Sequence, residues 1–197
     1  MPGVPWHPKG DERVSTHCGQ GNWSYSRAMY RTDRLHLRPG RREDAPGLFR
    51  AIADPDIARN LASAPWPYGL ADAERLASHP FNPEEPRLFI FREETGQAEL
   101  IGIAGLDRMP TGEVELGYWI AKAHWGRGYA TEAGRQMIGI ARTELGLPRL
   151  VAGYFVDNPA SGQVLRKLGF VSVPGVVDRN SRARGGAAAC QMCTLDL

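Results

Sequence analysis

The order of strand-like and helix-like segments constrains this fold more than any other feature of the 197-residue sequence. Three strand patterns follow one another directly, and then a helical pattern, a strand pattern and a second helical pattern alternate. These segments are residues 87–93, 99–106, 113–121, 129–145, 150–156 and 164–168. Successive strands followed by strand–helix units predict an α/β fold, with a mixed, mostly antiparallel central sheet flanked by helices.

Shorter segments complete the domain on either side of this centre. A strand pattern and several short, proline-interrupted helical patterns precede it, and two closing strands joined by a polar loop follow it. The strands are expected at residues 35–38, 170–173 and 188–197, the helices at 43–53 and within 54–79, and the polar loop holds Arg179, Arg182 and Arg184. Residues 30–197 are therefore expected to form one domain, as a monomer or a homodimer.

The first 29 residues differ from the rest of the chain. They are rich in Pro and Gly, show neither helical nor strand periodicity, and end at Met29, directly before the first expected element. We expect residues 1–29 to be a leader outside the fold, and one hypothesis is that natural translation starts at Met29.

Composition excludes several classes of protein. The net charge of +2 is too small for a nucleic-acid polyelectrolyte partner. The apolar run 100–106 is far shorter than the roughly 18 residues that suggest a membrane span, and the N-terminus lacks the apolar core of a secretion signal. Three cysteines make no disulfide framework, and the five histidines lack metal-ligand spacing. The sequence predicts a cytoplasmic protein without nucleic-acid, membrane or metal partners.

A glycine-rich junction before the helix at 129–145 is the strongest chemical signal. It reads Trp125-Gly126-Arg127-Gly128-Tyr129-Ala130. Two glycines let a ligand approach the backbone, and the unpaired amides of a first helical turn attract anions, so a diphosphate is a natural ligand. Neither G-x-x-x-x-G-K-[ST] nor G-x-G-x-x-G is present. A tight strand-to-helix turn explains the same glycines without any ligand.

A second motif begins at Asn158-Pro159-Ala160-Ser161 and ends at Lys167-Leu168-Gly169-Phe170. Asn158 suits a helix N-cap, Pro159 the first helical position, and Gly169 the end of the helix. Helix capping alone would need no function. Capping does not explain why this motif follows the glycine-rich junction after one helix and one strand.

Together with three other blocks, these motifs resemble the GCN5-related N-acetyltransferase (GNAT) family. The other blocks are Thr32-Asp33-Arg34-Leu35-His36-Leu37-Arg38-Pro39, Leu100-Ile101-Gly102 and Glu115-Leu116-Gly117-Tyr118-Trp119-Ile120. The resemblance covers about residues 31–173. Within the family it is to ribosomal-protein N-terminal acetyltransferases of the RimJ/RimL type.

The resemblance implies acetyl-CoA as co-substrate and a sheet splayed between the strands at 113–121 and 150–156, with pantetheine in the splay. It implies that the pyrophosphate binds backbone amides of the glycine-rich junction. The implied cofactor-binding residues are Gly117, Trp119, Ile120, Gly126, Arg127, Gly128, Tyr129, Ala130 and Asn158. Many members have Arg or Gln where this chain has Trp125, a difference that backbone-mediated binding should tolerate.

The resemblance also suggests the catalytic residues. Glu115 is the first candidate for the base, acting through water, because the family often places a carboxylate on this strand; an exposed strand glutamate without a role fits the sequence equally well. By analogy, a backbone N–H near Gly117 would polarise the thioester carbonyl. Residues 158–169 contain no tyrosine, which many members use to protonate the leaving thiolate, so Ser161 is the candidate acid.

The acceptor follows from amine chemistry. At pH 7 an α-amine is roughly one-tenth neutral, whereas a lysine is neutral in only about one molecule in 2,500. A site with a modest base therefore favours an α-amine, which Glu115 and Asp157 could both face. The prediction is an N-acetyltransferase that transfers acetyl directly to a primary amine of a protein or peptide. The alternatives are a small amine, such as an antibiotic or amino acid, and a catalytically inactive acyl-CoA-binding module.

Four weaker signals leave alternatives open. Trp66 and Tyr68 either frame the acceptor pocket or pack in the core, and His124 is expected to shape the glycine-rich junction. Cys190 and Cys193, three apart on a strand, are expected on opposite faces, which disfavours a metal or redox pair. The arginine-rich polar loop either guides an acidic acceptor or is simply solvated.

Overall fold

The structure is a computed structural model that describes residues 28–94 and 96–197. Its helices are α1 (Ala45–Ile52), α2 (Pro55–Ala58), α3 (Leu70–Ala77), α4 (Tyr129–Thr143) and α5 (Pro159–Lys167), with 3₁₀ turns η1 (Arg42–Asp44), η2 (Lys122–His124) and η3 (Arg182–Arg184). Its strands are β1 (Tyr30–Arg31), β2 (Leu35–Arg38), β3 (Arg87–Glu94), β4 (Gln97–Arg108), β5 (Val114–Ile120), β6 (Arg149–Phe155), β7 (Val171–Ser172), β8 (Val177–Ser181) and β9 (Gly186–Asp196). The expected leader lies almost entirely outside the described residues.

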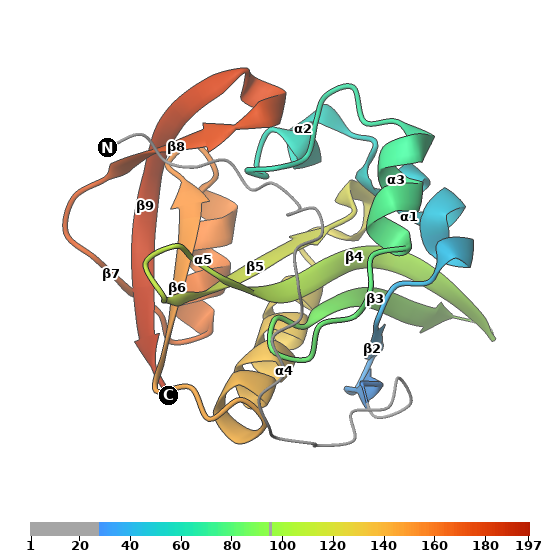
Figure 1. The fold of residues 1–197 in the computed structure, drawn as a ribbon, viewed down its shortest axis with the longest axis horizontal. Coiled ribbons are helices and arrows are strands. Elements are labelled where there is room, and N and C mark those ends of the chain that lie inside the picture. Colours follow the sequence, from blue (N-terminus) through green and yellow to red (C-terminus); the bar gives the residue numbers. More distant parts are fainter. Residues whose placement is uncertain (1–27, 95) are drawn as a thin grey trace, which may run out of the picture.

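These strands form one mixed sheet in the order β1-β2-β3-β4-β5-β6-β9-β7, with β8 also paired to β9 (Figure 1). Neighbouring strands are antiparallel except for β5 and β6, which are parallel. The predicted α/β fold with a mixed, mostly antiparallel sheet is therefore confirmed.

The sheet opens between β5 and β6. In the described residues, these strands are joined through a single register pair, Glu115 with Val151, near the start of β5. Each keeps a full antiparallel ladder with its other neighbour, β4 or β9. The two ladders are thus free to diverge after Glu115, which leaves the gap expected between the central strands.

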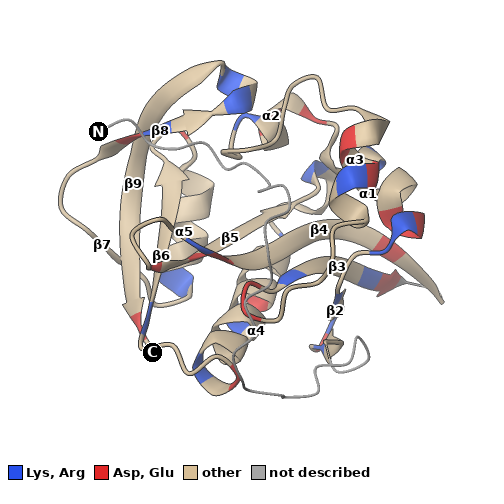
Figure 2. Ribbon diagram, in the orientation of Figure 1, with Lys and Arg blue, Asp and Glu red and all other residues tan. Residues whose placement is uncertain are grey.

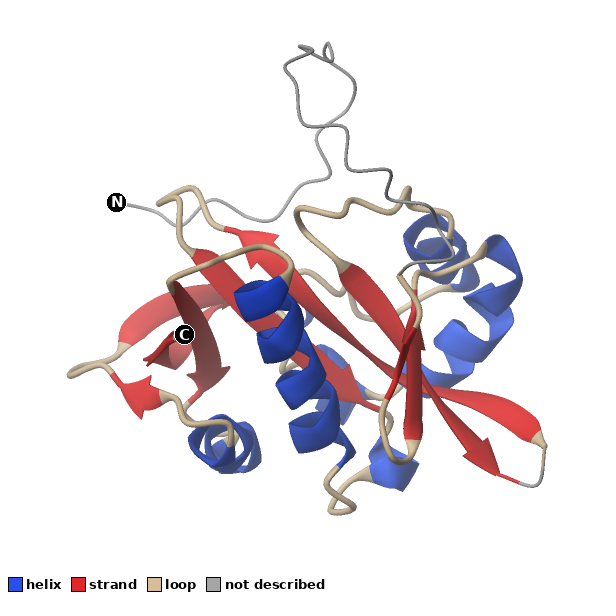
Figure 3. Ribbon diagram, turned by 90° about the horizontal axis from the view of Figure 1, so that it is seen from below, coloured by secondary structure: helices blue, strands red, loops and turns tan. Residues whose placement is uncertain are grey.

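Helices cover both faces of the sheet (Figure 3). Met137 of α4 and Leu165 of α5 pack with Leu116 of β5 in one buried cluster. On the other face, Leu48 of α1 packs with Phe89 of β3 in a second cluster that also includes α3. Because side chains alternate along a strand, the odd residues of β5 face the α1–α3 side and the even residues face α4 and α5.

The helix α4 forms because its apolar residues repeat every four positions. Ala133, Met137 and Ala141 are fully buried on one stripe, and polar residues occupy the opposite side. Gly146, with φ of 59°, follows the helix in the left-handed conformation that ends many helices. The predicted helix and its stop signal are confirmed.

The predicted polar loop after β7 is wrong. Residues 177–181 form strand β8, which makes an antiparallel hairpin with β9 through η3. The sequence Val-Asp-Arg-Asn-Ser lacks apolar alternation because β8 is an edge strand whose inward residues are polar. Arg179 is matched by a charge on β5, and the buried Ser181 donates a hydrogen bond to the Leu61 carbonyl. None of the helices in the described part of the chain is both long enough and apolar enough to cross a membrane.

Candidate functional site

The glycine-rich junction presents a row of backbone amides at the start of α4. Gly126 and Gly128 have φ of 75° and 82°, in the left-handed region that favours glycine. The amides of residues 126–130 donate to no other described residue, and residues 125–128 are exposed. Amides at a helix start carry partial positive charge, so this row can bind an anion such as a diphosphate.

Trp125 anchors the junction to the end of β5. Its indole Nε1 donates a 2.6 Å hydrogen bond to the Ile120 carbonyl, while the side chain remains 47% exposed. The Ile120 side chain belongs to the core under α4, and Trp119 packs on the other face of β5. The predicted contacts Trp119 and Ile120 thus lie on opposite faces of β5.

Gly117 leaves open space beside this gap. A Cβ added at Gly117 would meet no atom within 4 Å. The strands diverge two residues earlier, after the Glu115–Val151 pair. The backbone at Gly117 is therefore open to a ligand on the side where a side chain would project.

Asn158 caps α5, as the sequence predicts. Its Oδ1 accepts a hydrogen bond from the Ser161 amide at 3.4 Å, and Pro159 takes the first helical position. The side-chain NH₂ of Asn158 has no partner among the described residues. The cap thus leaves two hydrogen-bond donors available for a ligand.

A tyrosine that sequence reasoning did not single out contacts Ser161. The Tyr118 hydroxyl, on β5, lies 3.0 Å from Ser161 Oγ and 3.1 Å from the Ser161 carbonyl oxygen. Burial raises the pKa of Tyr118 to about 12, well above the ordinary thiol value of about 8.5. The Tyr118 hydroxyl is therefore protonated at neutral pH and within hydrogen-bond distance of the Ser161 hydroxyl.

Glu115 lies at the point where β5 and β6 separate and is only 9% exposed. Both its oxygens accept hydrogen bonds from Arg179 of β8, at 2.5 Å for Nη2 and Oε2, and Glu115 raises the pKa of the Arg179 guanidinium. Arg179 passes over Gly153 of β6, where an added Cβ would lie 3.0 Å from Nη1. A carboxylate has about four lone-pair positions, so this pairing leaves about two for water or an amine.

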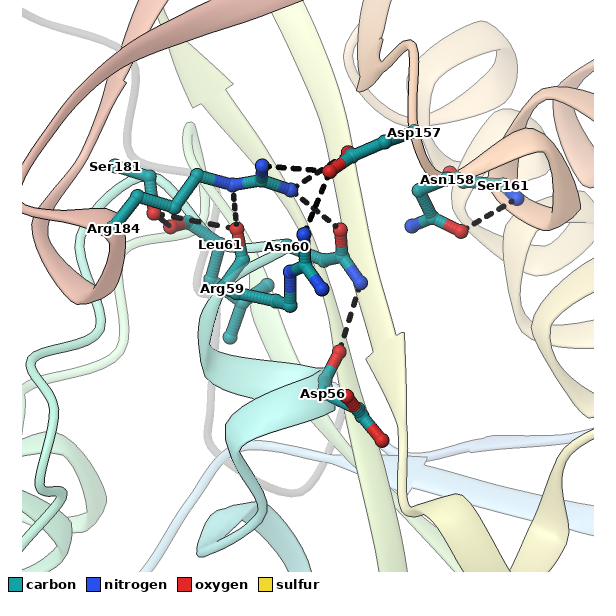
Figure 4. A network of polar contacts seen from close by, with 9 residues as sticks. All are labelled: Asp56, Arg59, Asn60, Leu61, Asp157, Asn158, Ser161, Ser181 and Arg184. Carbon is teal, nitrogen blue, oxygen red and sulfur yellow. Dashed lines mark hydrogen bonds and ion pairs between the residues drawn. The ribbon is translucent and has the colours of Figure 1, made fainter.

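Asp157 is also paired with arginines. Arg184 binds both its oxygens at 2.8 Å, and Arg59 adds a 2.7 Å contact (Figure 4). Arg184 Nε donates to the Arg59 carbonyl, and Ser181 Oγ donates to the Leu61 carbonyl. The hydrogen bond from Arg184 holds the pKa of the Asp157 carboxyl below its usual range. These contacts fasten the β8–β9 hairpin to the segment after α2.

The structure changes the interpretation of the three arginines. Basic residues lie at the turn of the β8–β9 hairpin (Figure 2), where η3 holds Arg182 and Arg184, and Arg179 lies within β8. Arg179 and Arg184 are held in ion pairs rather than solvated. Arg182 alone has an exposed side chain, and its amide donates to the Ala62 carbonyl at 3.1 Å. Spacing in the sequence gives no sign of these pairs, because each joins segments brought together only by the fold.

The structure also places the residues that gave weaker signals in the sequence. Tyr68 is buried in the α1–α3 core, whereas Trp66 is 43% exposed. His124 is buried beside the junction, with its ring edge towards Tyr129. The two cysteines of β9 are free, and Cys193 alone belongs to the core under α4, as expected for opposite faces.

Comparisons with known proteins agree with this architecture. Residues 34–171 match the family model described as an acetyltransferase (GNAT) domain. The chain is 29% identical to the uncharacterized N-acetyltransferase YoaA of Bacillus subtilis over 150 residues, which cover 71% of this chain and 80% of YoaA. It is 36% identical to the ribosomal-protein-serine acetyltransferase of Escherichia coli over 84 residues, 42% of this chain and 45% of that enzyme.

A solved structure supports the fold independently. The structure of RimL, a ribosomal L7/L12 α-N-protein acetyltransferase in complex with coenzyme A, has a TM-score of 0.67 at 17% identity. The match covers 84% of this chain and 96% of RimL. The region matched by the family model, residues 34–171, includes most of the described sheet, the glycine-rich junction and α5. This chain therefore belongs to the GNAT family and is an N-acetyltransferase.

Proposed function

We propose that this N-acetyltransferase uses acetyl-CoA and transfers its acetyl group directly to the α-amine of a protein or peptide. The observation that carries the use of acetyl-CoA is the row of unpartnered amides at residues 126–130, next to the open space at Gly117. The amides bind the diphosphate, and the pantetheine chain lies between β5 and β6. The Asn158 amide group contacts the same ligand.

The residues divide the chemistry between them. Glu115 accepts the amine proton through a water, using the lone pairs that Arg179 leaves free. The neutral amine attacks the thioester carbonyl, whose developing negative charge is stabilised by the backbone N–H near Gly117. The C–S bond then breaks, and Ser161, oriented by Tyr118, donates its proton to the thiolate and takes up the second proton that the attacking nitrogen loses.

The acceptor class rests on two arguments. A base engaged by an arginine is a weak means of deprotonating lysine, so the low pKa of an α-amine favours that acceptor. The similarity to the ribosomal-protein-serine acetyltransferase of Escherichia coli supports a protein acceptor.

Titration calorimetry with acetyl-CoA and with acetyl-pantetheine, which lacks the diphosphate and nucleotide, tests the co-substrate. Tight binding of acetyl-CoA alone supports the proposal, and no binding of either refutes it. Acceptor choice is tested with one peptide in two forms, with a free α-amine or with a formylated α-amine and a free lysine. Faster acetylation of the second peptide, or of small amines only, would overturn the α-amine assignment.

A further inference from the structure

Arg34, the residue directly before β2, makes several contacts with the glycine-rich junction and the first turn of α4, and the sequence predicted no role for it. Its Nη1 donates to the Arg127 carbonyl at 3.0 Å, and its guanidinium lies 4.7 Å from the centre of the Tyr129 ring. Its Nε and Nη2 bind Glu132 Oε2, in the first turn of α4, at 2.8 and 2.6 Å. The Arg34 side chain thus contacts one residue before α4, the first residue of α4 and one residue in its first turn.

The contact with the Arg127 carbonyl has a direct stereochemical consequence. The Arg127 carbonyl and the Gly128 N–H belong to one planar trans peptide, in which they point in opposite directions. A guanidinium that holds the carbonyl on one side therefore directs the Gly128 N–H to the other. Gly128 has a positive φ, so the same peptide would otherwise have many alternative orientations.

The position of Glu132, in the first turn of α4, is unexpected because a carboxylate near a diphosphate site repels the ligand. Burial opposes its ionisation, but hydrogen bonds from Thr32 and Arg34 hold the pKa of Glu132 below its usual range. Thr32 Oγ1 donates to Oε1 at 2.5 Å, and the Arg34 amide donates to the same oxygen at 2.9 Å. Glu132 is thus ionised and fully engaged in fixing Arg34.

We propose that Arg34 is a positioning residue for the co-substrate, which holds the peptide between Arg127 and Gly128 so that the junction amides face the diphosphate. Glu132 and Thr32 keep Arg34 in that position. This inference rests on the proposed use of acetyl-CoA. It assigns the binding energy to the aimed amides rather than to the charge of Arg34 itself.

Calorimetry with CoA and with pantetheine, on the full chain, tests this. Arg34→Ala and Arg34→Lys should each weaken CoA binding about tenfold, since lysine keeps the charge but loses the planar fork. Pantetheine binding should not change in either variant. Arg31→Ala, which removes an exposed arginine of β1, is the matched control and should bind both ligands like the wild type.

Glu132→Gln separates positioning from simple attraction. If Arg34 positions the loop, this variant loses CoA affinity, because Arg34 is released. If Arg34 only attracts the diphosphate, removing a nearby negative charge strengthens binding, and that result overturns the inference. Wild-type-like binding by Arg34→Lys would also overturn it. Absence of CoA binding by the wild type would instead refute the proposed co-substrate. Should Arg34→Ala fail to fold, the Arg34→Lys and Glu132→Gln arms decide the question.

Discussion

Two regions of the molecule use polar groups in opposite ways. One is the glycine-rich junction. The other consists of the carboxylate–arginine pairs, in which Glu115 binds Arg179 and Asp157 binds Arg59 and Arg184. The junction leaves five successive amides without a partner in the described chain, and Arg34 donates a hydrogen bond to its Arg127 carbonyl. Around Glu115 and Asp157, each charge is matched within the protein. A ligand can bind the junction without breaking a hydrogen bond of these amides to the described protein, whereas an acceptor must compete with ion pairs or use the lone pairs they leave.

The largest expected effect separates the two possible roles of Glu115. If Glu115 is the base, Glu115→Gln should lower kcat by about 10²- to 10⁴-fold, the usual contribution of such a group, without weakening acetyl-CoA binding. Steady-state kinetics and calorimetry measure the two quantities. Glu113→Gln, at an exposed glutamate just before β5, is the control. Full activity of Glu115→Gln would show that Glu115 serves only as the partner of Arg179.

The next effect concerns the stability of the same pair. Arg179→Met leaves a buried carboxylate without its partner and should lower the free energy of unfolding by about 3 kcal/mol. Replacing both residues, as in Glu115→Leu with Arg179→Leu, should recover much of this loss because no unpaired charge remains. Urea unfolding measures both variants. A loss below about 1 kcal/mol in Arg179→Met would mean that water compensates the charge.

A glycine substitution sharpens the contrast at the junction. Gly126→Ala and Gly112→Ala both place a Cβ at a positive φ, of 75° and 88°, with no atom within 4 Å. Each should therefore cost about 1 kcal/mol of stability. Only Gly126→Ala should also weaken CoA binding, by about tenfold, because its Cβ stands where the diphosphate approaches. Equal CoA affinities for the two variants would contradict the placement of the ligand.

Smaller losses are expected on the thiolate side. Ser161→Ala should lower kcat less than Glu115→Gln does, because a thiolate with a pKa near 8.5 leaves readily without an acid. Tyr118→Phe should cost less again, and the double variant should match Ser161→Ala, since Tyr118 acts through Ser161. With the pKa of Tyr118 raised to about 12, its ionisation should leave no inflection in the kcat profile below pH 10. A double variant much slower than Ser161→Ala would indicate an independent role for Tyr118.

The smallest expected effect is the loss at low pH of the contribution that the Asp157 carboxylate makes to the free energy of unfolding. Its pKa is lowered in the folded protein by Arg184, so its contribution is present above the unfolded value of about 3.9 and is lost as pH falls through the folded value. The carboxylate is 47% exposed, and the contribution should stay below about 1 kcal/mol. Thermal unfolding of Asp157→Asn and wild type should differ at pH 6 and converge as the pH falls through the lowered pKa of Asp157. A constant difference at all pH values would contradict an electrostatic origin.

Local patterns in the sequence were sufficient for most elements but not for β8. The stripe of Ala133, Met137 and Ala141 predicts α4 because burial of one helix face requires that spacing. Strand β8 was not predicted because an edge strand needs no apolar alternation, and because the charge of Arg179 is balanced by Glu115 of β5, 64 residues away in the sequence.

The sequence by itself determined the order of most elements, the glycine-rich junction and the cap at Asn158, because each depends on neighbours within a few residues. Only the tertiary structure decided which side chains form ion pairs. Arg179 pairs with Glu115, and Arg184 and Arg59 pair with Asp157. Arg34 pairs with Glu132 beside the glycine-rich junction. Side-chain pairs of this kind join residues that are distant along the chain. Their partners are fixed by strand register and by the path of the β8–β9 hairpin, which local periodicity does not encode.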